Sequence, residues 1–515
     1  AVVLAMAAAA VKWRVWLPFR ELAVTLFRML CCRGRRRRGE LSGLVFPTSP
    51  DEIDAETLTE LLRHGGHLPD GVAVTSVRRS GAAITDGVKG DKAVLEVSYG
   101  RAAGPPGEAG GGAESACDGA ADGAADGASD AMPGGDAKVE VPVHLDLPLP
   151  KRFFVKFSLQ GLSAMRLLME TTKVVRCEAL FYHRLAPKVA GVLRTPKCYF
   201  CDYSETTGEF ILLSELVEFG KNGIRPLKHR IRDKNVLEEQ LLFIRSGARL
   251  NAAMWHGKLG GVLDTMPRFD ETHREMWLVA QLMARFGGLG YTAQRTLRGR
   301  KVNEAFMTWD VPNRLRGRES ELISDMPRIM EHLCMDKEML AFGHNDYTTD
   351  NAFFWTESNE LKFGVFDWQQ SCVNNVGQEW AWNLHFLEPE FLTKHEDSFV
   401  DLILSTYEAN GRNIQREDFL RAYALGTIQM FVWGGSGLQF LLANLHGKGV
   451  FETMVPNDPR CRESKGTGLS EEVRKKMIGA EMTRRTFTNC CNIMRRHNFY
   501  DAWQEWKNPT SERSR

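Results

Sequence analysis

One short stretch, residues 344–367, restricts the possible folds of this chain more than any other. It contains the pattern H-x-D-x-x-x-x-N, formed by His344, Asp346 and Asn351, then an apolar strand pattern, a polar turn and a second apolar run that leads to Asp367. Phosphoryl transfer uses such a set, because one carboxylate orients a hydroxyl and accepts its proton while an amide and a second carboxylate hold Mg²⁺. The alternative is an ordinary loop and hairpin whose polar residues have no chemical role.

A lysine inside an apolar strand supports the chemical interpretation. Lys156 lies within Phe153–Phe157, and a buried lysine without a partner is costly. The helical pattern at 172–185 carries Glu178 on its apolar face, and we expect Pro187 to end that helix. A pair between Lys156 and Glu178 would match the strand lysine and helix glutamate that steady nucleotide phosphates. The alternative is that the lysine reaches solvent and the glutamate lies on a wet face.

The region before Lys156 predicts a sheet. Residues 72–77 and 93–99 alternate as strands around a loop, 80–91, that is rich in Gly and small residues. A strand, loop and strand of this kind cover the phosphates in kinase-like folds. The loop has no G-x-G-x-x-G pattern, so an ordinary hairpin is the alternative. Two more strands are expected at 192–203 and 210–216.

The second half of the chain predicts helices. A long helix is expected at Leu237–Trp255 and another at Ile329–Leu340, which leads to His344, with shorter helices and loops at 258–325 between them. Further helices are expected at 398–410, 417–432 and 470–496. Strands followed by helices predict an α+β fold.

Residues 101–137 interrupt the sheet pattern. They consist mainly of Gly, Ala, Pro and acidic residues, without Val, Ile, Leu or any aromatic residue. Such a segment cannot bury enough apolar surface to offset its ordering entropy. We therefore predict a disordered insertion. Its acidic residues lack the alternating spacing of a calcium loop.

The first forty residues are strongly basic. They carry nine Lys or Arg residues against Glu21 and Glu40, and an amphipathic helical pattern precedes Cys31 and Cys32. This pattern is typical of an acylated helix that lies on an anionic membrane. The chain would then contact the membrane peripherally through residues 1–40. A transit peptide and a disordered leader are the alternatives. The apolar run at the start is too short to span a membrane.

Composition limits the class of protein and its compartment. The formal net charge is +1, so no overall electrostatic argument favours nucleic acid as a partner. The eleven cysteines are scattered, which indicates a reducing compartment such as the cytoplasm. Cys198 and Cys201 form a single C-x-x-C within a predicted strand. We interpret them as two ordinary thiols, with a metal or redox role as the alternative.

Taken together, these motifs resemble the aminoglycoside phosphotransferase and choline kinase superfamily, and within it the CHK kinase-like or ecdysteroid kinase-like branch. The motifs that carry the resemblance are 154–156, 178–182, 211–216, 248–255, 344–351 and 365–369. The resemblance implies a two-lobed protein-kinase-like α+β fold. A small antiparallel sheet and one key helix would form the N-lobe, and a larger C-lobe would be mainly helical.

The resemblance also implies an enzyme, a small-molecule kinase that uses ATP and Mg²⁺. It would move the γ-phosphate to a hydroxyl of an amino alcohol, an aminoglycoside-like or a steroid-like acceptor. Asp346 would be the catalytic base and His344 would brace the loop. Asn351 and Asp367 would bind Mg²⁺.

Nucleotide contacts are implied in the first lobe. Lys156, held by Glu178, would contact phosphate. The chain leaves this lobe at Glu215 and Val217, where backbone groups would bind adenine.

The chain departs from the family at two positions. Asn345 stands where the family usually has Gly, and Glu379-Trp380 stands where it often has an Asp-Leu pair that braces the loop. A protein kinase is disfavoured because neither G-x-G-x-x-G nor A-P-E is found. A non-catalytic kinase-like nucleotide-binding or scaffold protein is the alternative function. Four tryptophans near the site suit either a quaternary ammonium acceptor or a helical core, and they are Trp355, Trp368, Trp380 and Trp382.

These predictions divide the chain into segments. They are a leader at 1–45, an N-lobe at 46–217 with its insertion at 101–137, a C-lobe at 218–507 with its catalytic and metal loop at 344–368, and a tail at 508–515.

Overall fold

The structure is a computed structural model. It describes residues 38–80, 91–101, 149–159, 166, 169–170, 174–225, 235–255, 257–287, 312–445 and 485–508. The predicted insertion after residue 101, the loop at 81–90, most of the leader and the tail beyond residue 508 lie outside these residues.

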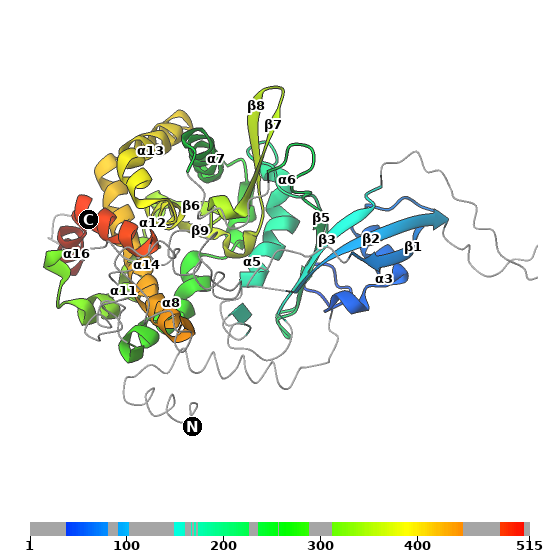
Figure 1. The fold of residues 1–515 in the computed structure, drawn as a ribbon, viewed down its shortest axis with the longest axis horizontal. Helices are drawn as coiled ribbons and strands as arrows, with labels where there is room; N and C mark the ends of the chain where they lie inside the picture. Colours follow the sequence, from blue (N-terminus) through cyan, green and yellow to red (C-terminus); the bar gives the residue numbers. More distant parts are fainter. Residues whose placement is uncertain are drawn as a thin grey trace, which may run out of the picture.

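The N-lobe is built on a five-stranded sheet at one end of the molecule (Figure 1). Its order is β1-β2-β3-β5-β4, and every neighbouring pair is antiparallel. The strands are β1 (Val72–Arg79), β2 (Asp91–Arg101), β3 (Arg152–Phe157), β4 (Cys198–Tyr203) and β5 (Phe210–Glu215). The predicted antiparallel sheet is therefore present.

The two faces of this sheet have different neighbours. Helix α3 (Ala55–His64) covers one face, where Leu58 packs with Val155 and Leu213 in an apolar core. Asp54 caps α3 by accepting a hydrogen bond from the Thr57 amide. The opposite face carries Lys156, so this face meets the rest of the molecule.

Helix α5 (Val174–Leu180) lies between the sheet and the C-lobe (Figure 1). A π-helical turn at Phe181–Leu185 and α6 (Ala186–Val189) continue it, so the prediction that Pro187 ends the helix is wrong. The proline lies in the first turn of α6, where its missing N–H is tolerated. Phe181 stacks on Trp368 at 3.6 Å between ring centroids, which joins α5 to the core of the C-lobe.

The C-lobe is mainly helical, as predicted. Its helices are α7 (Leu237–Trp255), α8 (Phe269–Gly287), α11 (Glu319–Leu333), α12 (Val376–Leu384), α13 (Pro389–Ala409), α14 (Arg416–Leu445), a helix over residues 485–496 and α16 (Phe499–Lys507). Short 3₁₀ turns occur at Pro50–Glu52, Gly260–Thr265, Asn313–Leu315, Lys337–Met339, Thr349–Asn351 and Trp368–Gln370. Residues 470–484 of the last predicted helix lie outside the described residues.

Two predictions for the C-lobe helices are wrong. The region 258–325 contains α8, a helix of 19 residues, instead of only short helices. The helix predicted at Ile329–Leu340 ends at Leu333, because Asp336 accepts a hydrogen bond from the Glu338 amide and starts a new turn.

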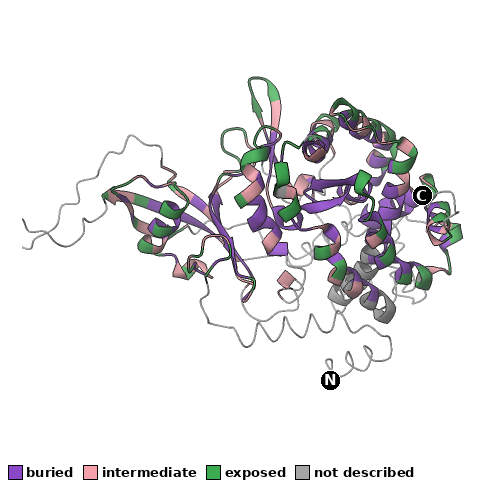
Figure 2. Ribbon diagram, turned by 180° about the vertical axis from the view of Figure 1, so that it is seen from behind, coloured by how far each residue is buried: buried purple, intermediate pink, exposed green. Residues whose placement is uncertain are grey.

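Two small sheets surround the loop at 344–351. Strand β6 (Leu340–Gly343) pairs with β9 (Cys372–Asn375), and β7 (Ala352–Glu357) pairs with β8 (Glu360–Val365). The β7–β8 hairpin projects from the molecule, and its tip is exposed (Figures 1 and 2).

Residues 38–45, assigned to the leader by sequence, fold back onto β4. The buried carboxylate of Asp202 accepts hydrogen bonds from the Leu41 and Ser42 amides at 3.0 and 2.9 Å. The Glu40 amide donates to the Tyr203 carbonyl at 2.9 Å. This segment therefore covers part of an edge strand.

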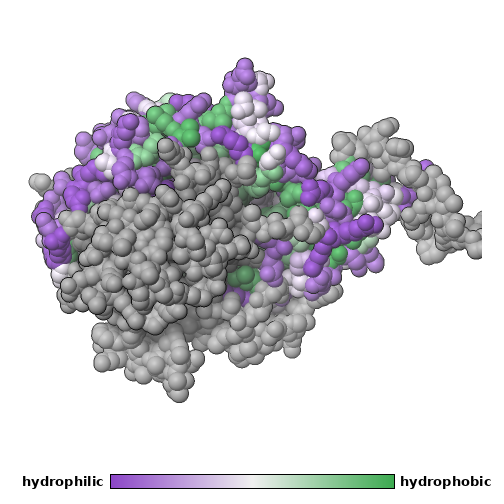
Figure 3. Space-filling model, in the orientation of Figure 1, coloured by the Kyte–Doolittle hydropathy of each residue, from purple (hydrophilic) through white to green (hydrophobic). Residues whose placement is uncertain are grey.

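Most buried residues lie inside the C-lobe, on α5 and in the sheet (Figure 2). On the face drawn in Figure 3, hydrophilic side chains dominate the coloured surface and hydrophobic ones form patches between them. In the described part of the chain, no helix has the length and apolar character needed to cross a membrane. Among the described residues, free thiols are found at Cys177, Cys198, Cys201, Cys334, Cys372 and Cys490.

Candidate active site

The loop at 344–351 is held in place by the pairing of two four-residue strands, β6 and β9. Gly343 at the end of β6 lies opposite Cys372 at the start of β9, so residues 366–371 return alongside the loop. Asn345 has a φ of +54°, a left-handed conformation that Asn tolerates better than most residues. Its side-chain amide donates to the carbonyls of Gly343 and Cys372, each at 3.2 Å. Position 345 thus needs a residue that accepts positive φ.

Glu379 of α12 supports the same loop through hydrogen bonds. Its buried carboxylate accepts hydrogen bonds from Asn251 Nδ2 at 2.9 Å and from the Asn345 amide at 3.5 Å. Burial raises the pKa of Glu379 to about 7, while the bonds from Asn251, Asn345 and the His344 backbone oppose that rise. A Cβ at Gly343 would lie 2.0 Å from both carboxylate oxygens, so Glu379 fits because residue 343 has no side chain.

His344 links the loop to the segment that carries Asp367. Its ring is fully buried, and Nε2 lies 3.1 Å from the Phe366 carbonyl oxygen, which makes that nitrogen the donor. Asp367 has a φ of +64° and a ψ of +57°, a conformation that costs energy for a residue with a side chain. The Phe366 amide donates to the Asn351 carbonyl at 2.9 Å, so Asn351 and Asp367 are attached to adjacent backbone.

The predicted ion pair between Lys156 and Glu178 is present. Lys156 Nζ lies 2.8 Å from Glu178 Oε2 and 2.7 Å from Asp367 Oδ1, so one ammonium joins the sheet, α5 and the C-lobe. Burial alone would lower the pKa of Lys156, but the carboxylates of Asp367 and Glu178 together hold it above its usual value. Burial raises the pKa of Glu178, and the positive charge of Lys156 partly opposes that rise.

Asp346 belongs to the loop, lies near Trp382 of α12 and is partly exposed. Asn351 Nδ2 donates to the Asp346 carbonyl at 2.9 Å, which fixes the amide of Asn351 and directs its oxygen away from that bond. Trp382 Nε1 lies 3.4 Å from Asp346 Oδ1, at the long end of the range for a hydrogen bond.

The segment that leaves the N-lobe begins at Glu215, the last residue of β5. Its amide donates to the Lys197 carbonyl at 2.7 Å, and its carboxylate accepts from Arg194 Nη2 at 2.6 Å and from the Lys197 amide at 3.1 Å. The Val217 carbonyl accepts from the Phe219 amide at 3.1 Å. The Glu215 side chain therefore binds Arg194, and a contact with a nucleotide base would have to come from backbone groups.

Two contributors to the site were not found from the sequence. Asn251 of α7 connects Glu379 to the Phe342 carbonyl, to which it donates at 3.0 Å, and its oxygen accepts from Tyr407. A single Asn on the buried face of a predicted helix was the available signal. Trp382 was noted only as one of four tryptophans, and nothing in the sequence shows that it contacts Asp346.

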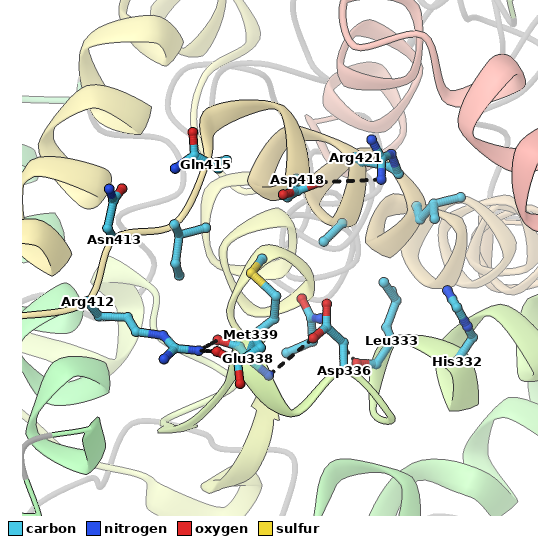
Figure 4. Close-up of a pocket in the computed structure, with 14 residues that line it drawn as sticks. His332, Leu333, Asp336, Glu338, Met339, Arg412, Asn413, Gln415, Asp418 and Arg421 are labelled. Carbon is cyan, nitrogen blue, oxygen red and sulfur yellow. Dashed lines mark hydrogen bonds and ion pairs between the residues drawn. The ribbon is translucent and has the colours of Figure 1, made fainter. Parts of the chain in front are cut away.

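The C-lobe has a separate hollow, of about 460 Å³, near the loop between α13 and α14 (Figure 4). Arg412 Nη2 donates to the Glu338 carbonyl at 2.8 Å, and Arg421 Nη1 lies 3.4 Å from Asp418. None of the site residues predicted from the sequence lines it.

Comparison with known proteins gives fold-level similarity alone. No family model matches the chain, and no curated protein matches its sequence. A Ralstonia eutropha protein proposed to be an aminoglycoside phosphotransferase is 11% identical with a TM-score of 0.37, over 84% of this chain and 97% of that one. A choline/ethanolamine kinase family protein from Mesorhizobium loti is 11% identical with a TM-score of 0.34, over 68% and 85%.

A microcompartment-associated aminopropanol kinase is 12% identical with a TM-score of 0.34, over 68% of this chain and 87% of that one. At these identities and TM-scores the matches do not decide activity or substrate. Both must be argued from the geometry of the site. The two-lobed kinase-like α+β architecture is the one described above.

Proposed function

We propose that this chain is a small-molecule kinase that transfers the γ-phosphate of ATP to a hydroxyl group in a Mg²⁺-dependent reaction. The observation that carries the proposal is the position of Lys156, whose ammonium bridges Glu178 and Asp367 at 2.8 and 2.7 Å. Asp367 is 211 residues from Lys156 in the chain, and it lies in the segment bonded to the loop that contains Asp346. A lysine, two carboxylates and an amide beside a partly exposed aspartate suit phosphoryl transfer.

Asp346 is proposed as the base. Its carboxylate would orient the acceptor hydroxyl and accept its proton as the phosphoryl group is transferred. His344 acts through position, because it holds the Phe366 carbonyl next to Asp367. Trp382 restrains one carboxylate oxygen of Asp346.

The residues proposed to hold Mg²⁺ are Asn351 and Asp367. Because Asn351 Nδ2 donates to the Asp346 carbonyl, its oxygen is the atom suited to bind a cation. Among the described residues, no group of three or more His, Cys, Asp or Glu side chains could hold a metal ion. Mg²⁺ at phosphate-transfer sites typically uses one or two protein oxygens with phosphates and water. When bound, the ion would neutralise charge on the phosphates.

Lys156, positioned by Glu178, is proposed to contact the nucleotide phosphates. The backbone at Glu215 and Val217 is proposed to bind the base. The acceptor is proposed to be an amino alcohol, an aminoglycoside-like or a steroid-like alcohol. The closer resemblance to the CHK kinase-like branch is proposed on the sequence motifs alone, as is contact of residues 1–40 with a membrane surface.

The test is an acceptor screen with purified protein, ATP and Mg²⁺, read as ADP formation over amino alcohols, aminoglycosides and sterols. We expect turnover with at least one acceptor, and we expect Asp346→Ala to reduce kcat by roughly 10²–10⁴-fold. ATP binding by the variant, measured calorimetrically, serves as the control for folding. Near wild-type kcat in Asp346→Ala would contradict the assignment of the base. ATP binding without turnover of any acceptor would favour a non-catalytic binding protein.

A further inference from the structure

Lys92, at the start of β2, lies directly opposite Lys156 of β3. Residues directly opposite in an antiparallel pair point to the same face of the sheet, with their Cβ atoms about 5 Å apart. The Lys156 ammonium reaches Glu178 and Asp367 on that face. The side chain of Lys92 therefore leaves the sheet on the side of the candidate active site.

A second observation agrees with this placement. The charge of Lys92 is among the interactions that lower the pKa of Glu178, although burial is the largest influence and raises it. An electrostatic effect on a buried carboxylate requires the lysine to lie near it. Lys92 is itself only partly buried.

Charge balance suggests what this second lysine does. Two lysines directly opposite each other repel, which is unfavourable for the sheet unless anions lie nearby. Glu178 and Asp367 already share the single charge of Lys156. The polyphosphate of a nucleotide would add negative charge that Lys156 alone cannot balance.

The sequence supplies a reason for an extra cation. The segment between β1 and β2 has no G-x-G-x-x-G pattern, which in protein kinases provides the loop over the phosphates. Lys92 is the second residue of β2 and lies one residue beyond that segment. A lysine serves as a compact point charge for phosphate without needing an exact loop geometry.

We propose that Lys92 is a second phosphate-binding cation of the nucleotide site, acting beside Lys156. This inference rests on the proposed kinase function. It names a residue that contacts the phosphate chain of the nucleotide, and it makes no claim on the acceptor.

The experiment compares Lys92→Gln and Lys92→Arg with the wild type, with Lys362→Gln as a matched control on an exposed strand lysine that pairs with Glu360. Affinities for ATP, ADP and adenosine are measured by calorimetry with Mg²⁺ present, together with the Tm of each protein without nucleotide. For Lys92→Gln we expect about tenfold weaker binding of ATP and ADP, the scale of one charge-assisted contact. Adenosine binding should not change, Lys92→Arg should recover most of the affinity, and Lys362→Gln should behave as wild type.

The outcomes separate the two proposals. If Lys92→Gln binds ATP as tightly as wild type and only its nucleotide-free Tm falls, Lys92 is a structural counter-ion of Glu178 and the inference is wrong. If ATP and adenosine weaken equally, the effect is not on the phosphates and the inference is also wrong. If the wild type binds no ATP, the proposed nucleotide site itself fails.

Discussion

The loop at 344–351 and the segment at 215–218, which connects the lobes, are held by opposite kinds of interaction. At the loop, Glu379, Asn251 and Asn345 are buried and joined by hydrogen bonds. At the connection, Arg194 pairs with Glu215 at side-chain exposures of 40% and 31%. A second connecting pair, Arg152 with Glu218, has exposures of 33% and 32%.

The difference shows which part of the site must stay fixed and which part can move. A fully satisfied buried network specifies one geometry, because any displacement leaves polar groups unpaired. Exposed ion pairs contribute little energy and re-form readily in water. The buried network therefore fixes the loop that carries Asp346, and the ion pairs at residues 215–218 hold the connection less tightly.

The strongest test of this difference is to remove the Glu379 carboxylate, which is bonded to the loop. In Glu379→Ala the Asn251 side chain and the Asn345 amide lose their shared acceptor. We expect the free energy of unfolding to fall by roughly 3 kcal/mol, the scale for buried groups left unsatisfied. We expect kcat to fall about 10²-fold, because a small misplacement of catalytic groups has that effect. Chemical denaturation and single-turnover kinetics measure the two quantities.

The matched control is Glu396→Ala in α13. Glu396 is equally buried but is bonded to Arg496 and Tyr423. It should lose stability to a similar degree while keeping kcat at temperatures where it is folded. If both variants lose kcat equally, Glu379 has no special role in positioning the loop.

A pH series sharpens the same comparison. The pKa of Glu379 is raised from 4.5 to about 7 in the folded protein. The folded state therefore binds the proton more tightly, so this stabilising contribution is present below about pH 4.5 and is lost as the pH rises through about 7. Relative to Glu379→Gln, which cannot ionise, the wild type should lose up to roughly 3 kcal/mol across that window. Urea denaturation at several pH values measures this difference, and parallel curves for the two proteins would refute it.

The smallest effect is expected at the connection between the lobes. Glu215→Gln removes the charge that Arg194 binds but keeps the backbone intact. We expect the free energy of unfolding to change by less than about 1 kcal/mol, and the difference from wild type to shrink in ~0.5 M salt. Thermal denaturation at low and high salt tests this. A loss as large as that of Glu379→Ala would mean that the connection is as rigid as the loop.

Sequence alone predicted those parts of the site whose residues are near each other in the chain or forced together by burial. Asp346, Asn351 and Asp367 lie within one loop and hairpin, and the cost of burying Lys156 indicated a partner on the next helix. The contact between Lys156 and Asp367 spans 211 residues and depends on how the lobes dock, which no local pattern reports.

Other features depend on elements too short to leave a periodic signal. Strands β6 and β9 have only four residues each, so the pairing that sets Gly343 opposite Cys372 was not predicted. For that reason the fit between Gly343 and Glu379 could not be predicted from the sequence. Glu379 was noted only as a residue that differs from the pattern of the family that the sequence resembles. The continuation past Pro187 depends on a π-helical turn that propensity does not indicate.

The stacking of Phe181 on Trp368 has a consequence for how this protein can be divided and recombined. Although α5 lies between two strands of the sheet in sequence, β3 and β4, its buried side chains belong to the large apolar core that the C-lobe forms. A chimera that exchanges the sheet between related proteins should therefore keep α5 with the C-lobe. Because β4 and β5 follow α5, such an exchange needs one junction between β3 and α5 and two more around the β4–β5 pair, and the donor sheet must reproduce the bonds of Lys156 with both Glu178 and Asp367.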